Sequence, residues 1–290
     1  MMEWDLDFIS QKDFDAHIEE TISKYGEALL PYSLKRLNSN LIDPVKLIFD
    51  KSVYGSSWEE TIKSEVFRQR DKSGNNSIGY FHQRMFNYIK GCVVPKEGWD
   101  VIFKTAKGFT TPDGNLVHTI YVEMKNKHNT MNSASSQRTY IKMQNQILQD
   151  DDCACYLVEA IAKQSQDIQW RTSVDGSQVH HRLIRRCSID QFYQIATGDP
   201  LAFYKICKQL PASIERVLSS SKATVSKPND TVFAELRKLA GLFGGEDDLA
   251  ISMAVYLLGF NTYEGFRSQL PDGVRDLDNP LVGLYKYAQR

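Results

Sequence analysis

The sequence predicts an α+β protein in which a central mixed β-sheet is flanked by helices. Apolar residues alternate with period two on both sides of a turn within residues 99–125, which indicates a hairpin. Apolar residues within 133–149 recur every three or four positions, as in an amphipathic helix, and an apolar strand follows at 154–162. Strands that lead through a helix to another strand favour a mixed sheet with helical flanks.

The composition is that of a globular protein and excludes several other classes. Of 290 residues, 42% are hydrophobic and 24% are charged, which is enough apolar material for one large core or two smaller ones. No stretch approaches the roughly 18 to 20 uncharged apolar residues that a membrane-spanning helix needs. The first residues, MMEWDLDFIS, are acidic where a signal peptide is basic. We therefore expect no membrane association and no secretion.

The cysteines indicate a reducing compartment. Their number is odd, and the one closely spaced pair has no histidine-rich motif nearby that would suggest a zinc site. The five are Cys92, Cys153, Cys155, Cys187 and Cys207. We expect reduced thiols that serve as packing residues in a cytoplasmic protein.

The N-terminal part of the chain is expected to be helical. Residues 11–30 and 40–52 carry apolar residues at helical spacing. Ser57 resembles the capped start of a third helix, which we expect to end in the polar segment 71–77. A further helix is expected over 78–89, stopped by the glycine two residues later.

Turn residues and periodicity organise the rest of the chain. Asp113 and Gly114 are a strong signal for the turn of the hairpin. After the helix and strand already described, a second strand is expected at 179–187, and from Ser188 onward the pattern is mostly helical. Residues 219–230 are the best candidate for a linker or long loop.

The net charge of −1 hides one basic segment. Summed by blocks, the charge is −6 over 1–60, +7 over 61–145, +1 over 146–228 and −3 over 229–290. The basic block interleaves cations with polar and aromatic residues, as around Arg68 and Arg70, which suits a groove that follows phosphates. A solvated basic face is the alternative that charge alone leaves open.

Asp100, Glu123 and Lys125 carry most of the chemical signal. Residues two apart on a strand point the same way, so Glu123 and Lys125 project from one face. If the hairpin brings Asp100 opposite them, two carboxylates and the Met124 backbone carbonyl offer hard oxygen ligands to Mg²⁺. The ion would lower the pKa of a bound water, and Lys125 would assist the attacking nucleophile. An exposed ion pair is the alternative interpretation of this spacing.

The same residues resemble a known family. Asp100 followed by Glu123, Met124 and Lys125 resembles the PD-(D/E)xK nuclease signature. The longer strings YVEMKNKHNTMN and IGYFHQRMFNYIKG resemble type II restriction endonucleases that cut GGNCC or GGWCC sites. The short signature is common, whereas the longer strings are specific. Weaker similarity in RLIRRCSIDQFYQIATGDPLAF extends the resemblance over roughly residues 60–210.

The resemblance implies a nuclease that hydrolyses phosphodiester bonds of double-stranded DNA at a short palindrome. In such an enzyme Asp100 and Glu123 hold Mg²⁺, for which Mn²⁺ is expected to substitute, and Lys125 assists at the transition state. A palindromic site calls for a homodimer. A restriction enzyme also implies a functionally paired DNA methyltransferase and a prokaryotic cytoplasm.

The resemblance also suggests a division of the chain. We expect a helical N-terminal region over 1–60, a PD-(D/E)xK-like nuclease core over 61–218, and a helical C-terminal region over 219–290 packed on that core. Two features depart from the family pattern. Trp99 stands where the superfamily often has proline, and the helix before the sheet offers no acid. Glu65 is the nearest upstream acid, either a second-metal ligand or a solvated helix residue.

DNA contacts are expected from a polar segment after the lysine and from basic residues elsewhere. A polar run directly after a core strand is costly to bury and suits contact with a polar ligand. Arg182 and Arg186 would share a strand face with His180 and could line a groove, although a solvated strand edge is the alternative. The predicted DNA-binding residues are Asn126, Lys127, His128, Asn129, Asn132, Arg68, Arg70, Arg182 and Arg186.

Two other functions are compatible with these residues. A structure-specific repair or recombination nuclease would use the same acids but would cut without sequence preference. A catalytically inactive DNA-binding module would keep the fold, although the joint presence of Asp100, Glu123 and Lys125 argues against it. Discrete bands from a digested plasmid would separate the first alternative from a restriction enzyme.

Overall fold

The chain forms two compact units, each assembled from segments distant in sequence. The computed structural model describes residues 3–28, 30–220, 229–245, 247–262 and 264–289. One unit, here called the sheet unit, consists of Met1–Lys24 and Asn75–Thr224, and the other, the helical unit, of Tyr25–Gly74 and Val225–Arg290. This division differs from the expected boundaries at residues 60 and 218.

Helices account for most of the chain outside one sheet. Those with residues in the sheet unit are α1 (Gln11–Ala28), α4 (Trp58–Met85), α5 (Ser133–Gln149), α6 (Ile189–Thr197) and α7 (Ala202–Ser220), with a 3-10 turn at Phe86–Tyr88. The others are α2 (Leu34–Asn38), α3 (Pro44–Tyr54), α8 (Val232–Ala240), α9 (Asp248–Phe260), α10 (Glu264–Arg267), α11 (Asp272–Arg275) and α12 (Pro280–Gln289), with a 3-10 turn at Gly241–Phe243. The predicted helix over 133–149 is confirmed to the residue as α5. Asn132 caps its first turn, which explains where the helix begins.

The predicted mixed sheet is confirmed. Its six strands lie in the order β1-β2-β3-β4-β8-β5. The strands are β1 (Cys92–Val93), β2 (Val101–Thr110), β3 (Leu116–Lys127), β4 (Cys153–Ile161), β5 (Asp167–Gln169) and β8 (Ile184–Ser188), and β6 (Thr172–Val174) and β7 (Ser177–Val179) form a separate ribbon. β2 and β3 are the antiparallel hairpin expected around the Asp-Gly turn, while β3, β4 and β8 run parallel. α5 connects β3 to β4, as parallel neighbours require.

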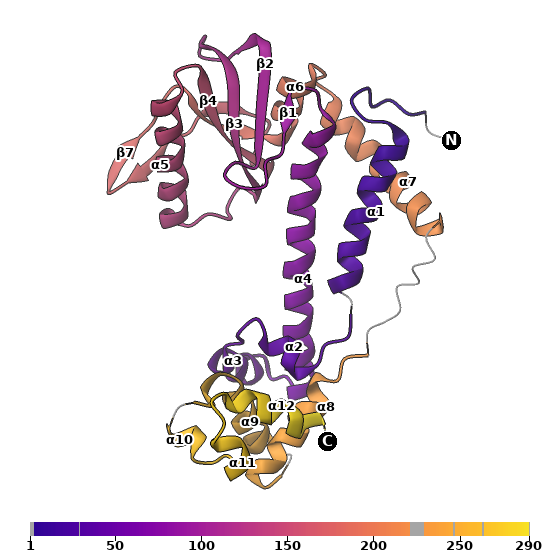
Figure 1. The fold of residues 1–290 in the computed structure, drawn as a ribbon, viewed down its shortest axis with the longest axis vertical. Helices are drawn as coiled ribbons and strands as arrows, with labels where there is room; N and C mark the ends of the chain where they lie inside the picture. Colours follow the sequence, from indigo (N-terminus) through magenta and orange to yellow (C-terminus); the bar gives the residue numbers. More distant parts are fainter. Residues whose placement is uncertain (1–2, 29, 221–228, 246, 263, 290) are drawn as a thin grey trace. The chain divides into compact units, whose positions relative to one another are not determined.

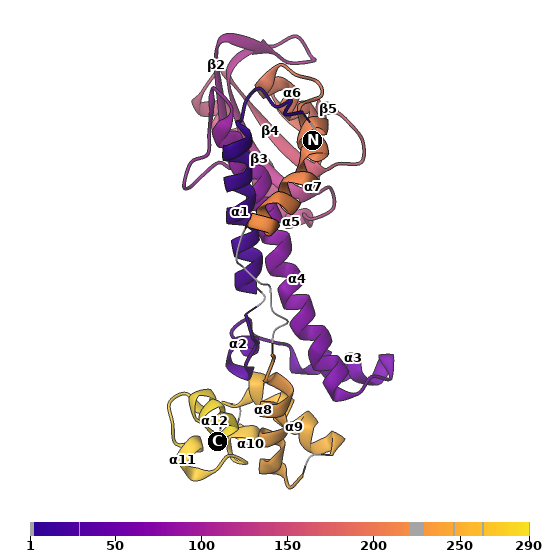
Figure 2. The same cartoon turned by 90° about the vertical axis from the view of Figure 1, so that its right-hand side faces the viewer.

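Side-chain alternation gives the sheet two apolar faces. Val122 and Tyr156 point into a cluster formed with α1, the end of α4, α6 and α7, whereas Tyr121 and Leu157 point into a cluster with α5. Figure 1 shows α5 on one side of the strands and the end of α4 on the other. α7 runs beside α1 (Figure 2), where the Arg216 guanidinium lies 2.7 Å from the Asp15 carboxylate. Glu123 shares the face that α5 covers.

Two predictions of secondary structure are wrong. The expected loop at 71–77 does not form, because α4 is one continuous helix from Trp58 to Met85. That segment is polar but contains no proline, so the helix can continue as long as other contacts support it. The expected strand 179–187 is divided into β7 and β8, and residues 180–183 belong to no strand.

The helical unit has its own apolar core. Buried side chains such as Leu37 and Trp58 pack with Leu236, Val255 and others from the C-terminal helices. The C-terminal tail is helical, as expected. Its partners in this core come from residues 32–66, most of which belong to the expected N-terminal region and not to the expected nuclease core over 61–218. Of the candidate linker 219–230, residues 221–228 lie outside the described residues.

All five cysteines are free thiols, and Cys153, Cys155 and Cys187 are buried among core residues. Burial raises the pKa of the Cys92 thiol to about 12, which keeps this thiol protonated and unreactive at neutral pH. Within the described ranges, no helix combines the length and apolarity needed to cross a bilayer.

Gly91 is expected to be indispensable for the path from α4 to the sheet. Its φ is +89°, and a Cβ would lie 2.5 Å from the Lys104 carbonyl oxygen, so Gly91→Ala adds both backbone strain and a collision with main chain. We expect a loss of about 2 kcal/mol or more in the free energy of unfolding, measured by urea titration. Gly98→Ala is the control, because φ is +92° there but nothing lies within 4 Å. Equal losses in both variants would contradict the collision.

Candidate active site

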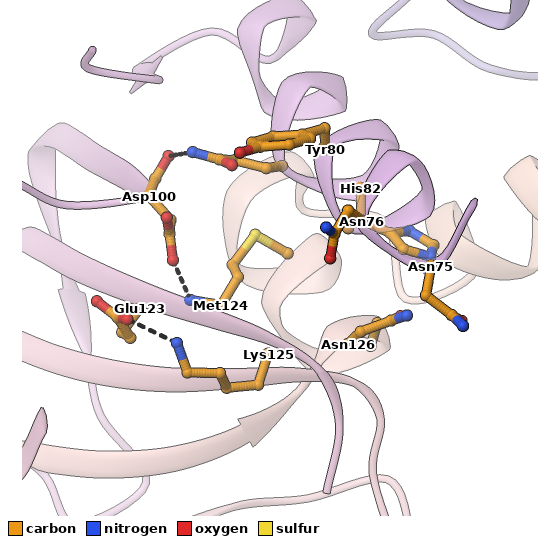
Figure 3. Close-up of a pocket in the computed structure, with 12 residues that line it drawn as sticks. Asn75, Asn76, Tyr80, His82, Asp100, Glu123, Met124, Lys125 and Asn126 are labelled. Atoms are coloured by element: carbon orange, nitrogen blue, oxygen red, sulfur yellow. Dashed lines mark hydrogen bonds and ion pairs between the residues drawn. The ribbon is translucent and has the colours of Figure 1, made fainter. Parts of the chain in front are cut away.

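Asp100 is held in place at three points where β2 begins. Its backbone N–H donates to the Val122 carbonyl over 3.0 Å, and its own carbonyl accepts from Gln83 Nε2 of α4 over 3.1 Å. Its carboxylate Oδ2 accepts a hydrogen bond of 2.7 Å from the Met124 backbone N–H (Figure 3). The side chain thus continues the pairing of the two strands beyond the start of β2. It lies beside the strand residues that were predicted to accompany it.

Glu123 is held between two lysines. Lys125 Nζ lies 2.7 Å from Glu123 Oε1, and Lys142 Nζ of α5 lies 2.8 Å from Oε2. Only 18% of the Glu123 side chain is exposed, so these are partly desolvated charge-assisted contacts and not surface ion pairs. The structure therefore brings Asp100, Glu123 and Lys125 together as the sequence predicts, and it adds Lys142.

The two carboxylates have pKa values shifted in opposite directions. Burial raises the pKa of Asp100, and the nearby Glu123 charge adds to this, against the lowering effect of the Met124 hydrogen bond and of the two lysines. Burial also acts to raise the pKa of Glu123, but hydrogen bonds from Lys125 and Lys142 outweigh it and the pKa is lowered. Unlike environments for two neighbouring acids are typical of sites that perform chemistry.

The acids open into a cleft of about 400 Å³. One wall is the end of α4, and the other consists of Asp100, just before β2, and of residues near the ends of β3 and β4. Figure 3 shows Tyr80 and His82 of α4 with Asp100, Glu123 and Lys125 around this cleft. The lining residues are Asn75, Asn76, Gly79, Tyr80, His82, Gln83, Asp100, Glu123, Met124, Lys125, Asn126 and Ala160. Within the described residues, no three His, Cys, Asp or Glu side chains gather to hold a metal ion. A cation in this cleft would therefore take two carboxylates and complete its shell with carbonyl oxygen or water.

Lys142 and its helix contribute contacts to this site that were not predicted from the sequence. Lys142 Nζ donates to the Gly98 carbonyl over 2.6 Å and lies 4.1 Å from the centre of the Trp99 ring. Trp99 Nε1 donates to Gln146 Oε1 over 3.2 Å, one turn further along α5. α5 therefore fixes the segment that leads into Asp100. No local signal identifies Lys142, since a lysine on an amphipathic helix is ordinarily a solvated residue.

His128 and Arg186, both predicted to contact DNA, share a buried carboxylate. Glu159 is fully buried, with His128 Nδ1 2.9 Å from its Oε2 and Arg186 Nε 3.0 Å from its Oε1. Arg186 Nη2 also donates to the His128 carbonyl over 3.0 Å. Arg182 is exposed and lies outside β8, so the expectation that it shares a strand face with Arg186 is wrong.

The upstream candidates lie in the helical unit and have partners there. Glu65 is buried, in contrast to the expected solvated residue, and accepts from Arg68 Nη2 over 2.6 Å and from Gln69 Nε2 over 3.1 Å. Arg70 Nη2 lies 2.6 Å from the Asp230 carboxylate. Nothing in these contacts supports Glu65 as a metal ligand, and the charges of Arg68 and Arg70 are already balanced by carboxylates.

The polar residues at the end of β3 and directly after it differ in their surroundings. Asn126 lines the cleft, and Lys127 and Asn129 are exposed beside it in sequence. Asn132 is the N-cap of α5, where its side-chain oxygen accepts from the Ser135 N–H over 2.9 Å. The first three remain available for a ligand, whereas the Asn132 oxygen is committed to the helix.

Fold and cleft together define a class of protein. A six-stranded mixed sheet with helices on both faces, and with paired acids and a lysine where β2 and β3 part, is a nuclease-like α+β core. A family model described as Eco47II restriction endonuclease matches residues 6–219, most of the chain. The chain belongs to this family of type II restriction endonucleases, which are site-specific deoxyribonucleases.

Two curated relatives agree with this assignment. The type II restriction enzyme Sau96I of Staphylococcus aureus is 28% identical over 243 residues, which cover 81% of this chain and 89% of that enzyme. The type II restriction enzyme Eco47II of Escherichia coli is 28% identical over 224 residues, which cover 74% of this chain and 88% of that enzyme. Both matches extend over nearly the whole length of the relative.

Asp100→Asn is expected to stabilise the protein at neutral pH. The folded-state pKa of Asp100 is raised, so the ionised form costs stability above that pKa, and a neutral amide removes this cost while still accepting from Met124 N–H. We expect a gain of about 1 kcal/mol near pH 8 that disappears near pH 4, measured by urea unfolding. Asp152→Asn is the control, because its hydrogen bond with His118 lowers the pKa of Asp152. A gain in stability that persists at low pH would contradict the raised pKa of Asp100 as its cause.

Lys142→Met is expected to shift the pH dependence of DNA cleavage. Loss of one of the two amines raises the pKa of Glu123, so the acidic limb of the rate profile should move to higher pH and the maximal rate should fall roughly tenfold. Lys142→Arg should restore the limb, because it keeps a charged donor. If the acidic limb stays in place in Lys142→Met, Lys142 does not act through Glu123.

Proposed function

We propose that the chain is a Mg²⁺-dependent type II restriction endonuclease that hydrolyses phosphodiester bonds of double-stranded DNA at a GGNCC- or GGWCC-like palindrome. The observation that carries the proposal is the shared cleft of Asp100, Glu123 and Lys125. The proposed recognition site comes from the resemblance of the segment around Glu123 to enzymes that cut such sites.

The donor atoms present suit a hard divalent cation. Mg²⁺ is commonly bound by one or two carboxylates with water in its remaining positions, which matches the two acids that line this cleft. The N–H and C=O of one strand residue point to the same edge, so the Met124 carbonyl faces the side where its N–H meets Asp100. Asp100 and Glu123, with this carbonyl, would hold Mg²⁺ or a substituting Mn²⁺. The bound ion would supply Lewis acidity and a more acidic water.

The chain's own side chains have separable tasks in hydrolysis. Lys125 presents an ammonium beside Glu123, where it would orient the attacking water and stabilise the charge that develops on the phosphate oxygens. Lys142 holds the other Glu123 oxygen and acts as a positioning residue. Asn126 lines the same cleft, and Lys127 and Asn129 follow it at the surface, so these would contact the DNA backbone or base edges.

The proposal includes partners. A palindrome presents the same phosphodiester on each strand, and one chain has one such cleft in the described part of the sheet unit, so two copies related by a two-fold axis would cut both strands. A restriction enzyme also needs a DNA methyltransferase of the same specificity to protect the host DNA. The five free thiols suit a reducing cytoplasm.

The experiment that tests the proposal is digestion of plasmid DNA by the purified protein. We expect discrete fragments with Mg²⁺ or Mn²⁺, and fragment ends that map to one short palindrome. Removal of metal by a chelator should stop cleavage, and added Mg²⁺ should restore it. A smear would favour a nuclease without sequence preference, and intact DNA with every metal would refute the proposal.

Lys125→Ala should separate binding from catalysis. Without the amine we expect the cleavage rate to fall at least about 100-fold, because one preorganised donor at the transition state is lost. Binding of the specific duplex, followed by gel shift, should change little, since most affinity comes from other phosphate contacts. Lys104→Ala, an exposed lysine on β2 outside the cleft, is the control. Full cleavage by Lys125→Ala would contradict the assigned role.

A further inference from the structure

Gly79 occupies a helical position that packing does not explain. It lies inside α4, where glycine is the poorest helix former apart from proline. A Cβ built at Gly79 would meet nothing within 4 Å. Two other helical glycines are different: at Gly259 a Cβ would lie 2.8 Å from Pro44 Cγ, and at Gly74 it would lie 3.2 Å from the Tyr25 ring. Those two glycines lie against close neighbours, whereas Gly79 faces open space.

The open space in front of Gly79 is the cleft of the candidate active site. Gly79 lines this cleft, with Asn75 and Gln83 one turn before and after it on the same side of α4. Gln83 Nε2 donates to the Asp100 carbonyl, so this side of the helix is fixed against the start of β2. Across the cleft the lining includes Ala160, another small side chain. Small residues on both walls widen the cleft beside the two carboxylates.

The adjoining surface suits a phosphate backbone. Tyr80 is half exposed, and its ring lies 5.7 Å from both Lys24 Nζ and the Arg84 guanidinium carbon. Both cations share a single acid, Glu20, so positive charge is in excess at this end of the wall. Excess positive charge beside exposed amide and phenol groups is typical of surfaces that follow sugar and phosphate.

We propose that the wall of α4 around Gly79 receives the sugar-phosphate backbone of the DNA strand that is cut. The missing side chain leaves room for the strand to pass between α4 and the ends of β3 and β4 and to reach Asp100 and Glu123. Asn76 and Tyr80 border this passage and would contact phosphate or sugar. This inference rests on the proposed nuclease function, and it adds the surface along which the substrate enters.

The test compares substitutions at Gly79 with the same substitutions at Gly26. Gly26 lies inside α1, and a Cβ there also meets nothing within 4 Å, but it does not line the cleft. Both alanine variants should unfold at an equal or higher temperature than the unaltered protein, because alanine favours the helix. Gly79→Leu should weaken binding of the cognate duplex at least tenfold in a gel shift and reduce its cleavage accordingly. Gly26→Leu should bind and cleave normally.

Each outcome of this comparison decides the inference. Normal DNA binding by Gly79→Leu overturns it and leaves the nuclease function standing, since the unaltered protein cleaves in the same assay. Lower thermal stability of Gly79→Ala also overturns it, because glycine would then be required for folding. If the unaltered protein neither binds nor cleaves duplex DNA with Mg²⁺ or Mn²⁺, the proposed function fails first and this inference fails with it.

Discussion

The candidate site depends on the hydrogen bond that the Met124 backbone N–H donates to the Asp100 carboxylate. β2 begins at Val101, one residue after Asp100, so Met124 of β3 lies beyond the last paired residue of β2. The Asp100 side chain therefore accepts the hydrogen bond that a strand partner would otherwise accept from Met124. An unsatisfied N–H in a partly buried cleft would be costly, and the bond therefore fixes the carboxylate. Glu123 and Lys125 flank Met124 in the sequence. One backbone contact thus sets the positions of all three ionisable groups relative to one another.

A second network supports the chain just beyond these groups. Glu159 pairs in register with Lys125 and is fully buried, so its charge must be compensated within the protein. Arg186 and His128 provide that compensation from β8 and from the segment after β3. Removal of either partner would leave part of a buried carboxylate unpaired. Two of the side chains predicted to contact DNA therefore also hold the end of β3 in place, which keeps Lys125 beside the cleft.

Local patterns sufficed for the hairpin and for α5, because alternation and three-to-four spacing belong to a single segment. The meeting of Asp100 with Glu123 was predictable as well, since a hairpin sets which residues face each other. The contact of Lys142 with Glu123 was not, because it depends on how α5 crosses the sheet. The continuity of α4 through 71–77 was equally hidden, because a polar segment is helical or not according to the contacts of its neighbours.

Part of the positive charge of the basic block over residues 61–145 is already paired with carboxylates. Lys125 and Lys142 both face Glu123, and Arg68 faces Glu65, so several cations counted in the net charge of this segment are already paired. A phosphate that reaches the cleft must compete with the Glu123 carboxylate for the same two amines. Such competition weakens binding of arbitrary phosphates and favours a ligand held by further contacts along the cleft. In the proposed function, selectivity for a positioned DNA strand would therefore begin with the charge balance at Glu123.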